Sequence, residues 1–326
     1  MAATMIAPPH AADFLATAGW PGAAILPLAG DASFRRYFRV RDAGRAAVLM
    51  DAPPPEDPRP FIAVGEQLLA AGLAAPRVLA ADLERGLLLL DDFGDAQMKG
   101  VVEADPAAEE AIYADAVDLL VHLQRHGAGA LPPYDRDVLL REARLLPEWY
   151  APMTGQAVDA AGYDAAWDAV LEPLYQPAAR AVVVLRDYHS ENIMLLDGRS
   201  GIDRLGLLDY QDALAGHPAY DLVSLLQDAR RDVPDALEAA MLARFRSATA
   251  GDEAFDAAYH LLGAQRNAKI IGIFARLAVR DGKPRYLELL PRVWRYLERD
   301  LNHPALKPVA DWFALNLPAD RREGHR

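Results

Sequence analysis

The hydrophobic periodicity of the chain changes near residue 92, and this change limits the folds that the chain can adopt. Before that point, short strand-like runs alternate with one well-patterned helix. After it, apolar residues recur mostly at helical spacing, interrupted by a single compact β region. A length of 326 residues also exceeds what one hydrophobic core usually serves. The pattern predicts an α+β, bilobal fold with a small β-sheet lobe over residues 1–92 and a mainly helical lobe over residues 93–326.

The first lobe is predicted to contain strands over residues 34–40, 46–50 and 87–90, because these runs are apolar or alternate with period two. A turn at Gly44 joins the first two strands. Between the second and third strands, Asp57 begins a helix with apolar residues at helical spacing that ends near Gly72.

The second lobe opens with the best-capped helix of the sequence, which runs from Asp105 at the N-cap to Gly127 after its last turn. Its apolar stripe predicts a core-facing side. Further helices are predicted around residues 137–150, 162–175, 218–230, 235–249, 254–280 and 284–301.

Composition excludes several classes of protein. The formal net charge is −13, which disfavours binding along a nucleic-acid backbone. The chain has no cysteine, so disulfides, thiolate metal sites and cysteine nucleophiles are excluded. The N-terminus lacks the pattern of a signal peptide, and the most apolar window, residues 15–30, is interrupted by Gly and Pro. We expect a cytoplasmic protein without a membrane segment.

The β region of the second lobe carries three polar residues at its strand ends. Residues 181–185 and 193–196 are predicted strands, and a third strand over residues 205–208 ends at Asp209. Asp187 and Asn192 lie in the loop between the first two strands. The topology therefore predicts that these three side chains converge.

Phosphoryl transfer requires this set of groups. A carboxylate orients the attacking hydroxyl, and oxygen ligands hold Mg²⁺ against the nucleotide phosphates. We assign Asp187 as catalytic base or orienter, and Asn192 and Asp209 as Mg²⁺ ligands. The alternative is that these residues serve only as hairpin-turn and helix-cap residues.

At these residues the chain resembles the aminoglycoside phosphotransferase and choline kinase superfamily across nearly its whole length. Residues 185–192 (Leu-Arg-Asp-Tyr-His-Ser-Glu-Asn) are similar to the catalytic loop of that family, residues 207–211 to its metal loop and residues 216–222 to a following structural motif. The resemblance implies a protein-kinase-like fold, ATP and Mg²⁺ as cofactors, and supporting roles for His189 and Asp221 near the catalytic loop.

In the first lobe, residues 30–37 occupy the position of the phosphate-covering loop of the family. We therefore predict nucleotide contacts from Gly30, Ser33 and Arg35, although a turn with one glycine is common in proteins. Asp91, where the third predicted strand ends, is also assigned to the nucleotide site.

The chief departure from the family pattern lies on the second predicted strand. Met50 stands where the family has a lysine that pairs with phosphates and with a helix glutamate. Glu66 matches that glutamate and is assigned to the nucleotide site. Arg35 or Arg36 is a candidate to replace the missing lysine, and Leu185 stands where the family usually has a histidine.

Several shorter stretches are similar to a narrower branch, the bacterial kinases that act on the anomeric hydroxyl of cell-wall amino sugars. These stretches are residues 30–37, 50–54, 91–95 and 272–283. The resemblance implies ATP-dependent phosphorylation of the C1 hydroxyl of N-acetylmuramate or N-acetylglucosamine in sugar recycling. A small-molecule amino sugar is thus the expected partner.

Four residues are predicted to contact the acceptor. Glu142 and Trp149 lie on one segment, because carboxylates accept hydrogen bonds from sugar hydroxyls and aromatic faces suit sugar rings. Arg266 and Lys269, three residues apart on one helix, are candidates to bind the lactyl carboxylate of a muramate. Core packing for Trp149 and a solvated face for the two cations are the alternatives.

Two other functions remain open at this point. One is an aminoglycoside or other small-molecule phosphotransferase, which shares the same catalytic loop. The other is a non-catalytic nucleotide-binding module, suggested by the absent lysine. A protein kinase is disfavoured because no Ala-Pro-Glu motif follows the metal loop and the connection from Asp209 to Pro218 is short.

Overall fold

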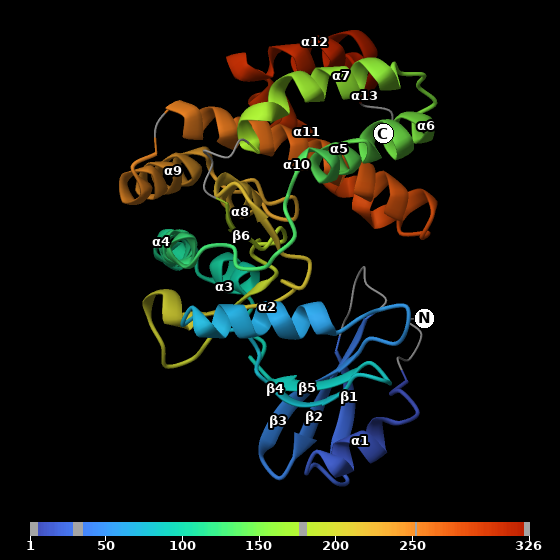
Figure 1. The fold of residues 1–326 in the computed structure, drawn as a ribbon, viewed down its shortest axis with the longest axis vertical. Coiled ribbons are helices and arrows are strands. Elements are labelled where there is room, and N and C mark those ends of the chain that lie inside the picture. The colour runs from blue at the N-terminus through green and yellow to red at the C-terminus, as the bar shows by residue number, and fades with distance from the viewer. Residues whose placement is uncertain (1–5, 29–34, 176–180, 252, 323–326) are drawn as a thin grey trace. The chain divides into compact units, whose positions relative to one another are not determined.

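The computed structural model describes residues 6–28, 35–175, 181–251 and 253–322 and divides into two compact units (Figure 1). The first unit consists of Met1–Ala104 and Glu191–Asp212, and the second consists of Asp105–Ser190 and Ala213–Arg326. The chain therefore leaves the first unit after residue 104 and returns to it for a second, shorter segment.

An antiparallel five-stranded sheet forms the centre of the first unit, with strand order β1-β2-β3-β5-β4. The strands are β1 (Ala24–Leu28), β2 (Arg36–Asp42), β3 (Arg45–Asp51), β4 (Val78–Asp82) and β5 (Leu87–Asp91). The turn between β2 and β3 has positive φ at Ala43 (44°) and Gly44 (84°), as a tight hairpin requires. The predicted strands over residues 46–50 and 87–90 and the turn at Gly44 are confirmed, and Phe34 of the first predicted strand lies outside the described residues.

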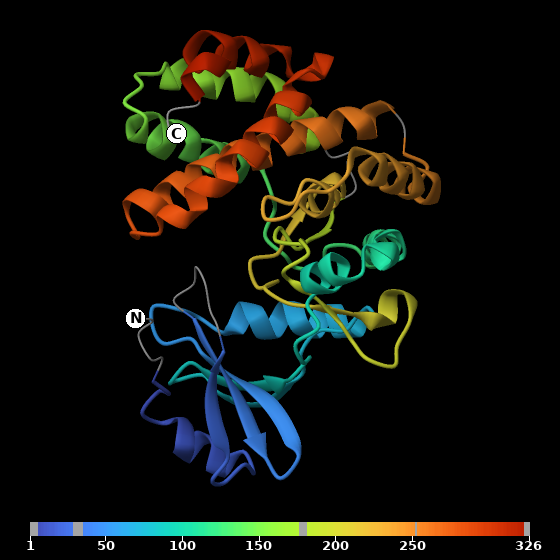
Figure 2. The same ribbon diagram turned by 180° about the vertical axis from the view of Figure 1, so that it is seen from behind.

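The first unit also contains the helices α1 and α2. On one face, α1 (Ala11–Thr17) packs its apolar side chains against Phe38 and Val40 of β2 and Leu49 of β3 (Figures 1 and 2). The predicted helix after Asp57 is α2 (Arg59–Ala70), whose buried residues follow helical spacing. It ends before Gly72, where φ is 79°.

A small hairpin and a short helix complete the first unit. Strands β7 (Ile193–Leu195) and β8 (Leu205–Leu207) pair in antiparallel register, Ile193 opposite Leu207. The Leu207 amide donates to the carbonyl of Ala74 (2.8 Å), and the Leu195 amide donates to the carbonyl of Ala96 (2.7 Å), just before α3 (Met98–Ala104). These bonds attach the hairpin to the N-terminal segment.

The second unit is mainly helical, as predicted. Asp105 caps a 3-10 turn (Pro106–Ala108) that leads into α4 (Glu109–Leu123), and the chain turns at Gly127. The other longer helices are α5 (Arg136–Ala143), α7 (Ala160–Leu171), α8 (Ala219–Leu226), α9 (Asp235–Thr249), α10 (Glu253–Val279), α11 (Leu290–Leu301) and α12 (Lys307–Asn316). Two short strands, β6 (Val182–Val184) and β9 (Leu214–Gly216), pair with each other.

The predicted helix over residues 137–150 is not continuous. The α-helix α5 gives way to a π-helical turn over Leu146–Tyr150 that contains Pro147. Proline has no amide hydrogen to donate and its ring crowds the preceding turn, so the regular hydrogen-bond ladder cannot pass through it. Opposite this turn, Gly272 of α10 approaches the backbone of Leu145 closely.

The fold class is confirmed: a five-stranded antiparallel sheet stands in the first unit, and helices dominate the second. The predicted division at residue 92 differs from the two compact units. Residues 93–104 and the β7–β8 hairpin group with the sheet, because their backbone hydrogen bonds join them to the N-terminal segment. In the described ranges, every helix is too short or too polar to cross a membrane.

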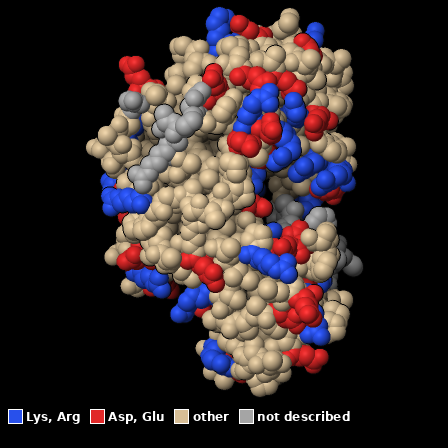
Figure 3. Space-filling model, viewed as in Figure 1, with Lys and Arg blue, Asp and Glu red and all other residues tan. Residues whose placement is uncertain are grey.

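The surface carries both signs of charge. On the face shown in Figure 3, Lys and Arg side chains are interspersed with Asp and Glu side chains. Many of them pair; on α11, Arg292 and Arg295 both bind Asp232 (2.8 and 2.6 Å). This intermixing fits a chain that carries 34 basic and 47 acidic residues.

Candidate functional site

The loop that carries Asp187 follows β6 in the second unit and is held by a buried carboxylate. The amides of Leu185 and Arg186 donate to Asp221 at 2.6 and 2.9 Å. Arg186 has a φ of 71°, a left-handed conformation that needs such support in a non-glycine residue. Burial raises the pKa of Asp221 to about 7, and the two amide hydrogen bonds oppose that rise. Asp221 therefore fixes the backbone immediately before Asp187.

The residues after Asp187 are anchored as well. The Tyr188 hydroxyl donates to a backbone carbonyl of α4 (2.9 Å), and the amide and hydroxyl of Ser190 both donate to Asp228 (3.2 and 2.6 Å). The buried His189 ring lies 3.2 Å from Arg230. Burial, and then the charge of Arg230, lowers the pKa of His189 to about 4, so the ring is neutral near pH 7 and accepts from Arg230.

The Asp187 carboxyl lies in a strongly positive environment. Burial acts to raise its pKa, but the charges of Lys269 and Arg266 outweigh burial and lower the pKa below the ordinary value for aspartate. Lys269 and Arg266 project from α10, and both are buried, at 8% and 3% exposure. Asp187 is therefore ionised at neutral pH and able to accept a hydrogen bond from a hydroxyl.

Behind this loop, Glu142 of α5 joins a buried ion-pair network. Its carboxylate accepts from Lys269 (3.0 Å), pairs with Arg186 and accepts from the Tyr134 hydroxyl. Lys269 also donates to the hydroxyl of Tyr220 (3.2 Å). Burial would raise the pKa of Glu142, but Lys269 and Arg186 outweigh burial and lower it. The network connects α5, α10 and the residue next to Asp187.

The four residues predicted to contact an acceptor thus divide into two groups. Glu142, Arg266 and Lys269 come together beside Asp187, yet their polar groups already bind one another or, for Arg266, the Ser224 hydroxyl (2.8 Å). Trp149, on the π-helical turn, is half-buried, whereas the other four tryptophans of the chain are buried. Trp149 is the more accessible of the four to a ligand.

The two predicted metal ligands lie together in the first unit. Asn192 precedes β7 and Asp209 follows β8, and their side chains are 3.5 Å apart. The backbone carbonyl of Asn192 accepts from the Leu208 amide (2.9 Å), and the Gln211 side chain donates to Asp209 (2.8 Å). Among the described residues, no group of three or more His, Asp or Glu side chains is arranged so that it could hold a metal ion. Two oxygen ligands fit Mg²⁺, which keeps several waters or phosphate oxygens in its shell.

A tyrosine anchors the loop that carries Asp209. The Tyr210 ring stacks on Phe61 of α2 with centroids 4.8 Å apart. A Cβ at Gly65 would come within 2.8 Å of the Tyr210 hydroxyl oxygen, so glycine makes room for the ring on this face of the helix. Asp209 itself has a φ of 56° and is exposed. Its left-handed backbone is supported by the packing of the next residue.

The residues predicted to bind the nucleotide are placed as follows. Arg35 pairs with Glu56 (3.0 Å), and Glu66 on α2 is exposed and forms no ion pair with a described residue. Gly30 and Ser33 lie outside the described residues. Met50 is fully buried in β3, so the lysine–glutamate pair of the family has no counterpart at these two positions.

Other polar groups occupy this side of the sheet. Arg36 binds Asp51 through two nitrogens (2.8 and 2.5 Å). Burial and then the negative charge of Asp209 raise the pKa of Tyr37 to about 12, which places the Tyr37 phenol in the surroundings of Asp209. Arg35 lowers that pKa. Tyr37 of β2 is thus near the Asp209 loop, and Arg35, directly before β2, is near Tyr37.

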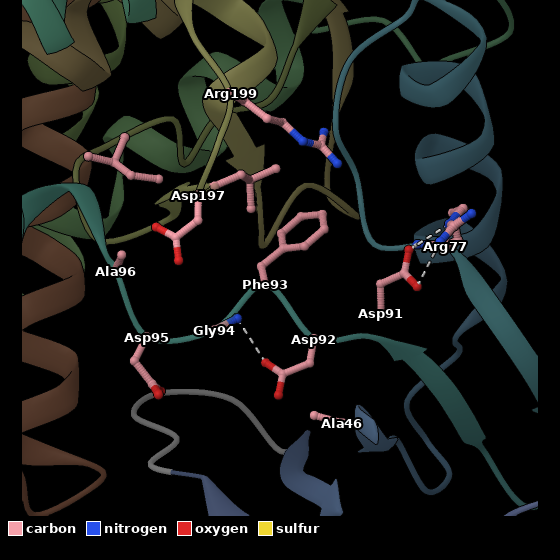
Figure 4. Close-up of a pocket in the computed structure, with 12 residues that line it drawn as sticks. Ala46, Arg77, Asp91, Asp92, Phe93, Gly94, Asp95, Ala96, Asp197 and Arg199 are labelled. Atoms are coloured by element: carbon pink, nitrogen blue, oxygen red, sulfur yellow. Dashed lines mark hydrogen bonds and ion pairs between the residues drawn. The ribbon is translucent and has the colours of Figure 1, made fainter. Parts of the chain in front are cut away.

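A pocket of about 540 Å³ opens in the first unit next to the residues that follow β5 (Figure 4). Asp91 pairs with Arg77 (2.7 Å), and the Asp92 carboxylate accepts from the Gly94 amide (2.9 Å). Arg39 of β2 crosslinks this segment by pairing with Asp92 (2.7 Å) and Asp95. The pocket lining also includes Leu195, Leu196, Asp197 and Arg199. It is a polar-walled pocket with fixed backbone groups.

Sequence reasoning missed several residues that build the site. Arg186, Tyr134 and Tyr220 complete the Glu142 network, and Asp228 anchors Ser190. The role of Arg186 could have been predicted from the sequence, because an arginine directly before an essential carboxylate needs a partner of its own. The tyrosines and Asp228 carry no local signal, since their roles arise from contacts between distant segments.

Comparison with known proteins gives a consistent result. The family model described as the phosphotransferase enzyme family matches residues 24–261. An N-acetylmuramate/N-acetylglucosamine kinase of Pseudomonas aeruginosa is 42% identical over 296 residues, covering 86% of this chain and 85% of the relative. A kinase of the same name from Caulobacter vibrioides is 37% identical over 354 residues, covering 95% of this chain and 97% of the relative.

Solved structures share the fold at low sequence identity. A choline/ethanolamine kinase family protein from Mesorhizobium loti has a TM-score of 0.61 and 16% identity, covering 93% of this chain and 96% of that chain. An aminoglycoside phosphotransferase in a ternary complex with ADP and hygromycin B has a TM-score of 0.57 and 15% identity, covering 90% and 99%. These likenesses concern the fold.

Proposed function

Because the chain belongs to the phosphotransferase enzyme family, we propose that it transfers the γ-phosphoryl group of ATP to the anomeric hydroxyl of N-acetylmuramate and N-acetylglucosamine. The observation that carries the choice of acceptor is the name shared by relatives that are about 40% identical over most of this chain. In this proposal the product is a sugar 1-phosphate that returns cell-wall sugar to biosynthesis in the cytoplasm.

Asp187 is the base or orienter in this proposal. Its carboxylate accepts a hydrogen bond from the C1 hydroxyl and directs an oxygen lone pair toward the γ-phosphorus. The lowered pKa of Asp187 keeps it ionised, which favours orientation over strong proton abstraction. An anomeric hydroxyl is more acidic than other sugar hydroxyls, so a weak base suffices. Asp221 and the Glu142 network hold the loop in position.

Asn192 and Asp209 hold Mg²⁺ in this proposal, and their oxygen ligands fit that ion. When bound, the ion neutralises charge on the nucleotide phosphates. Gln211 orients the Asp209 carboxylate through one oxygen, and Tyr210 fixes the backbone beside it. These contacts prepare the two ligands before the nucleotide arrives.

The nucleotide is proposed to bind the first unit. The pocket beside Asp91 and Asp92 is the proposed site of the base, and the segment after β1, which includes Gly30 and Ser33, is the proposed phosphate cover. Arg35, which directly precedes β2 and pairs with Glu56, supplies a positive charge near Tyr37. It is our proposed replacement for the lysine that Met50 displaces.

The test is phosphate transfer from ATP and Mg²⁺ to N-acetylmuramate, N-acetylglucosamine and kanamycin, with the position of the phosphate read by NMR. We expect a sugar 1-phosphate from both amino sugars, and a loss of about 10²- to 10⁴-fold in kcat for Asp187→Asn. Turnover of kanamycin alone would replace the proposed acceptor. Nucleotide binding without transfer to any of the three would contradict the kinase assignment.

A further inference from the structure

One face of α10 carries a row of cationic side chains that begins beside Asp187. Arg266, Lys269 and Arg276 are spaced by three and seven residues, so they share one side of the helix. Arg266 and Lys269 are buried beside Asp187, whereas Arg276 is half-buried two turns farther along. At 1.5 Å per residue, Arg276 lies roughly 10 Å beyond Lys269 along the helix axis.

The cations of this row differ in whether a carboxylate binds them. Lys269 is paired with Glu142 (3.0 Å). Arg276 forms no ion pair with a described residue, and its buried Nε has no hydrogen-bond partner among the described residues. Without a bound carboxylate, the guanidinium of Arg276 is left to bind an anion through its terminal nitrogens.

Electrostatics distinguishes Arg276 from other partly buried arginines. Burial and then the charge of Arg280 lower the pKa of Arg276 below the ordinary value. Arg231 and Arg299 have raised pKa values despite burial, because Tyr113 and Glu109 act on Arg231 and Glu238 acts on Arg299. Arg276 is therefore a cation that forms no ion pair with a described residue, and the nearby carboxylates of Asp281 and Glu148 raise its pKa less than burial and Arg280 lower it.

The π-helical turn with Trp149 packs against the same part of α10. A Cβ at Gly272 would lie 2.2 Å from the carbonyl carbon of Leu145, so the two backbones are in close contact there. Glu148 influences the pKa of Arg276, which places this turn beside the Arg276 end of the row. No aromatic ring of a described residue stacks on the half-buried Trp149 indole. Part of the Trp149 side chain is exposed to solvent.

We propose that Arg276 binds the lactyl carboxylate of N-acetylmuramate, with Trp149 against the sugar ring, and thereby sets the preference between the two amino sugars. This inference rests on the proposed function. The acceptor's C1 hydroxyl lies at Asp187, and the separation along α10 is of the order of a hexose ring with its lactyl substituent. Lys269, predicted from the sequence for this role, already pairs with Glu142.

The experiment measures kcat and KM for both sugars in the wild type, Arg276→Gln and Arg276→Lys. For Arg276→Gln we expect kcat/KM for N-acetylmuramate to fall about 10- to 100-fold, mainly through KM, because a charge-assisted bidentate contact is lost. The value for N-acetylglucosamine should change less than about threefold, and Arg276→Lys should recover part of the loss. Arg280→Gln is the matched control, because Arg280 already pairs with Asp281 (2.6 Å).

A second measurement does not depend on how the variant folds. The methyl ester of N-acetylmuramate removes the carboxylate charge, so the wild type should prefer the acid to the ester and Arg276→Gln should not. The role of Arg276 would be overturned if Arg276→Gln lost kcat/KM equally on both sugars while its thermal unfolding stayed unchanged. It would also be overturned if the wild type did not prefer the acid to the ester. Wild-type failure on both sugars would instead refute the proposed function itself.

Discussion

At the scale of single residues, the site depends on a carboxylate whose charge is maintained by its neighbours. Lys269 contributes most to the lowered pKa of Asp187, although the two side chains belong to different elements. Glu142 in turn fixes the position of Lys269 through a 3.0 Å ion pair. The chemistry of Asp187 is therefore set partly by a residue that need not touch the substrate.

This arrangement predicts the pH dependence of the reaction. A group whose folded pKa is lowered stays ionised to lower pH, so the acidic limb of the kcat profile of the wild type should lie below the range of an ordinary aspartate. The Lys269→Met substitution removes the cation, so the pKa of Asp187 should rise. As the pH falls, the variant should therefore begin to lose activity at a higher pH than the wild type does. Lys269→Arg keeps the charge and should leave the limb nearly unchanged.

The control for this profile is Lys307→Met, since Lys307 is an exposed lysine paired with Asp311 (2.8 Å) on α12. Because removing one partner of a buried ion pair costs roughly 3 to 5 kcal/mol, folding of Lys269→Met should be checked by circular dichroism before the profile is measured. An acidic limb that stays in place in a folded Lys269→Met variant would contradict the role of Lys269.

At the scale of elements, the close approach of α10 to the segment before the π-helical turn depends on Gly272. A methyl group there would meet the backbone of Leu145, which cannot yield as a flexible side chain would. We expect Gly272→Ala to lower the free energy of unfolding by about 1 to 3 kcal/mol, despite the better helix propensity of alanine. Urea denaturation measures this change.

Gly100 in α3 is the matched control for Gly272. A Cβ added there meets no atom within 4 Å, so Gly100→Ala should be neutral or stabilise the protein by up to about 1 kcal/mol. If both substitutions had the same effect, the close packing of α10 at Leu145 would not be the cause.

The elements also show how far the sequence alone leads. The strands of the sheet, the helix stripes and the order Asp187, Asn192, Asp209 follow from local patterns, because periodicity and capping act within a few residues. The pairing of β6 with β9 does not follow, since β7 and β8 lie between these two strands in the chain. For the same reason the partners of Arg186 were missed, and Pro147 was not recognised as the cause of a π-helical turn.

At the scale of the whole molecule, ligand binding should increase the stability of the folded protein and so raise its melting temperature. A ligand present at 100 times its Kd stabilises the folded state by about 2.7 kcal/mol if it does not bind the unfolded chain. We expect a non-hydrolysable ATP analogue with Mg²⁺ to raise the melting temperature more than the analogue with EDTA. In Asp209→Asn that difference should largely disappear, because a charged metal ligand has been removed.

Asp203→Asn serves as the control for this measurement. Asp203 is an exposed aspartate in the 3-10 turn of the same unit, and it is not an assigned ligand. A Mg²⁺-dependent rise in melting temperature that persists in Asp209→Asn would refute the assignment of Asp209 as a metal ligand.

The path of the chain through the two compact units restricts how the protein can be divided. The first unit is completed only by residues 191–212, which are synthesised after the whole segment 105–190 of the second unit. A single cut after residue 104 would release an N-terminal fragment that lacks the β7–β8 hairpin, and with it both proposed metal ligands. If the protein were reassembled from two fragments cut at that boundary, the C-terminal fragment would have to supply the hairpin. The hairpin would then have to bind the sheet of the N-terminal fragment.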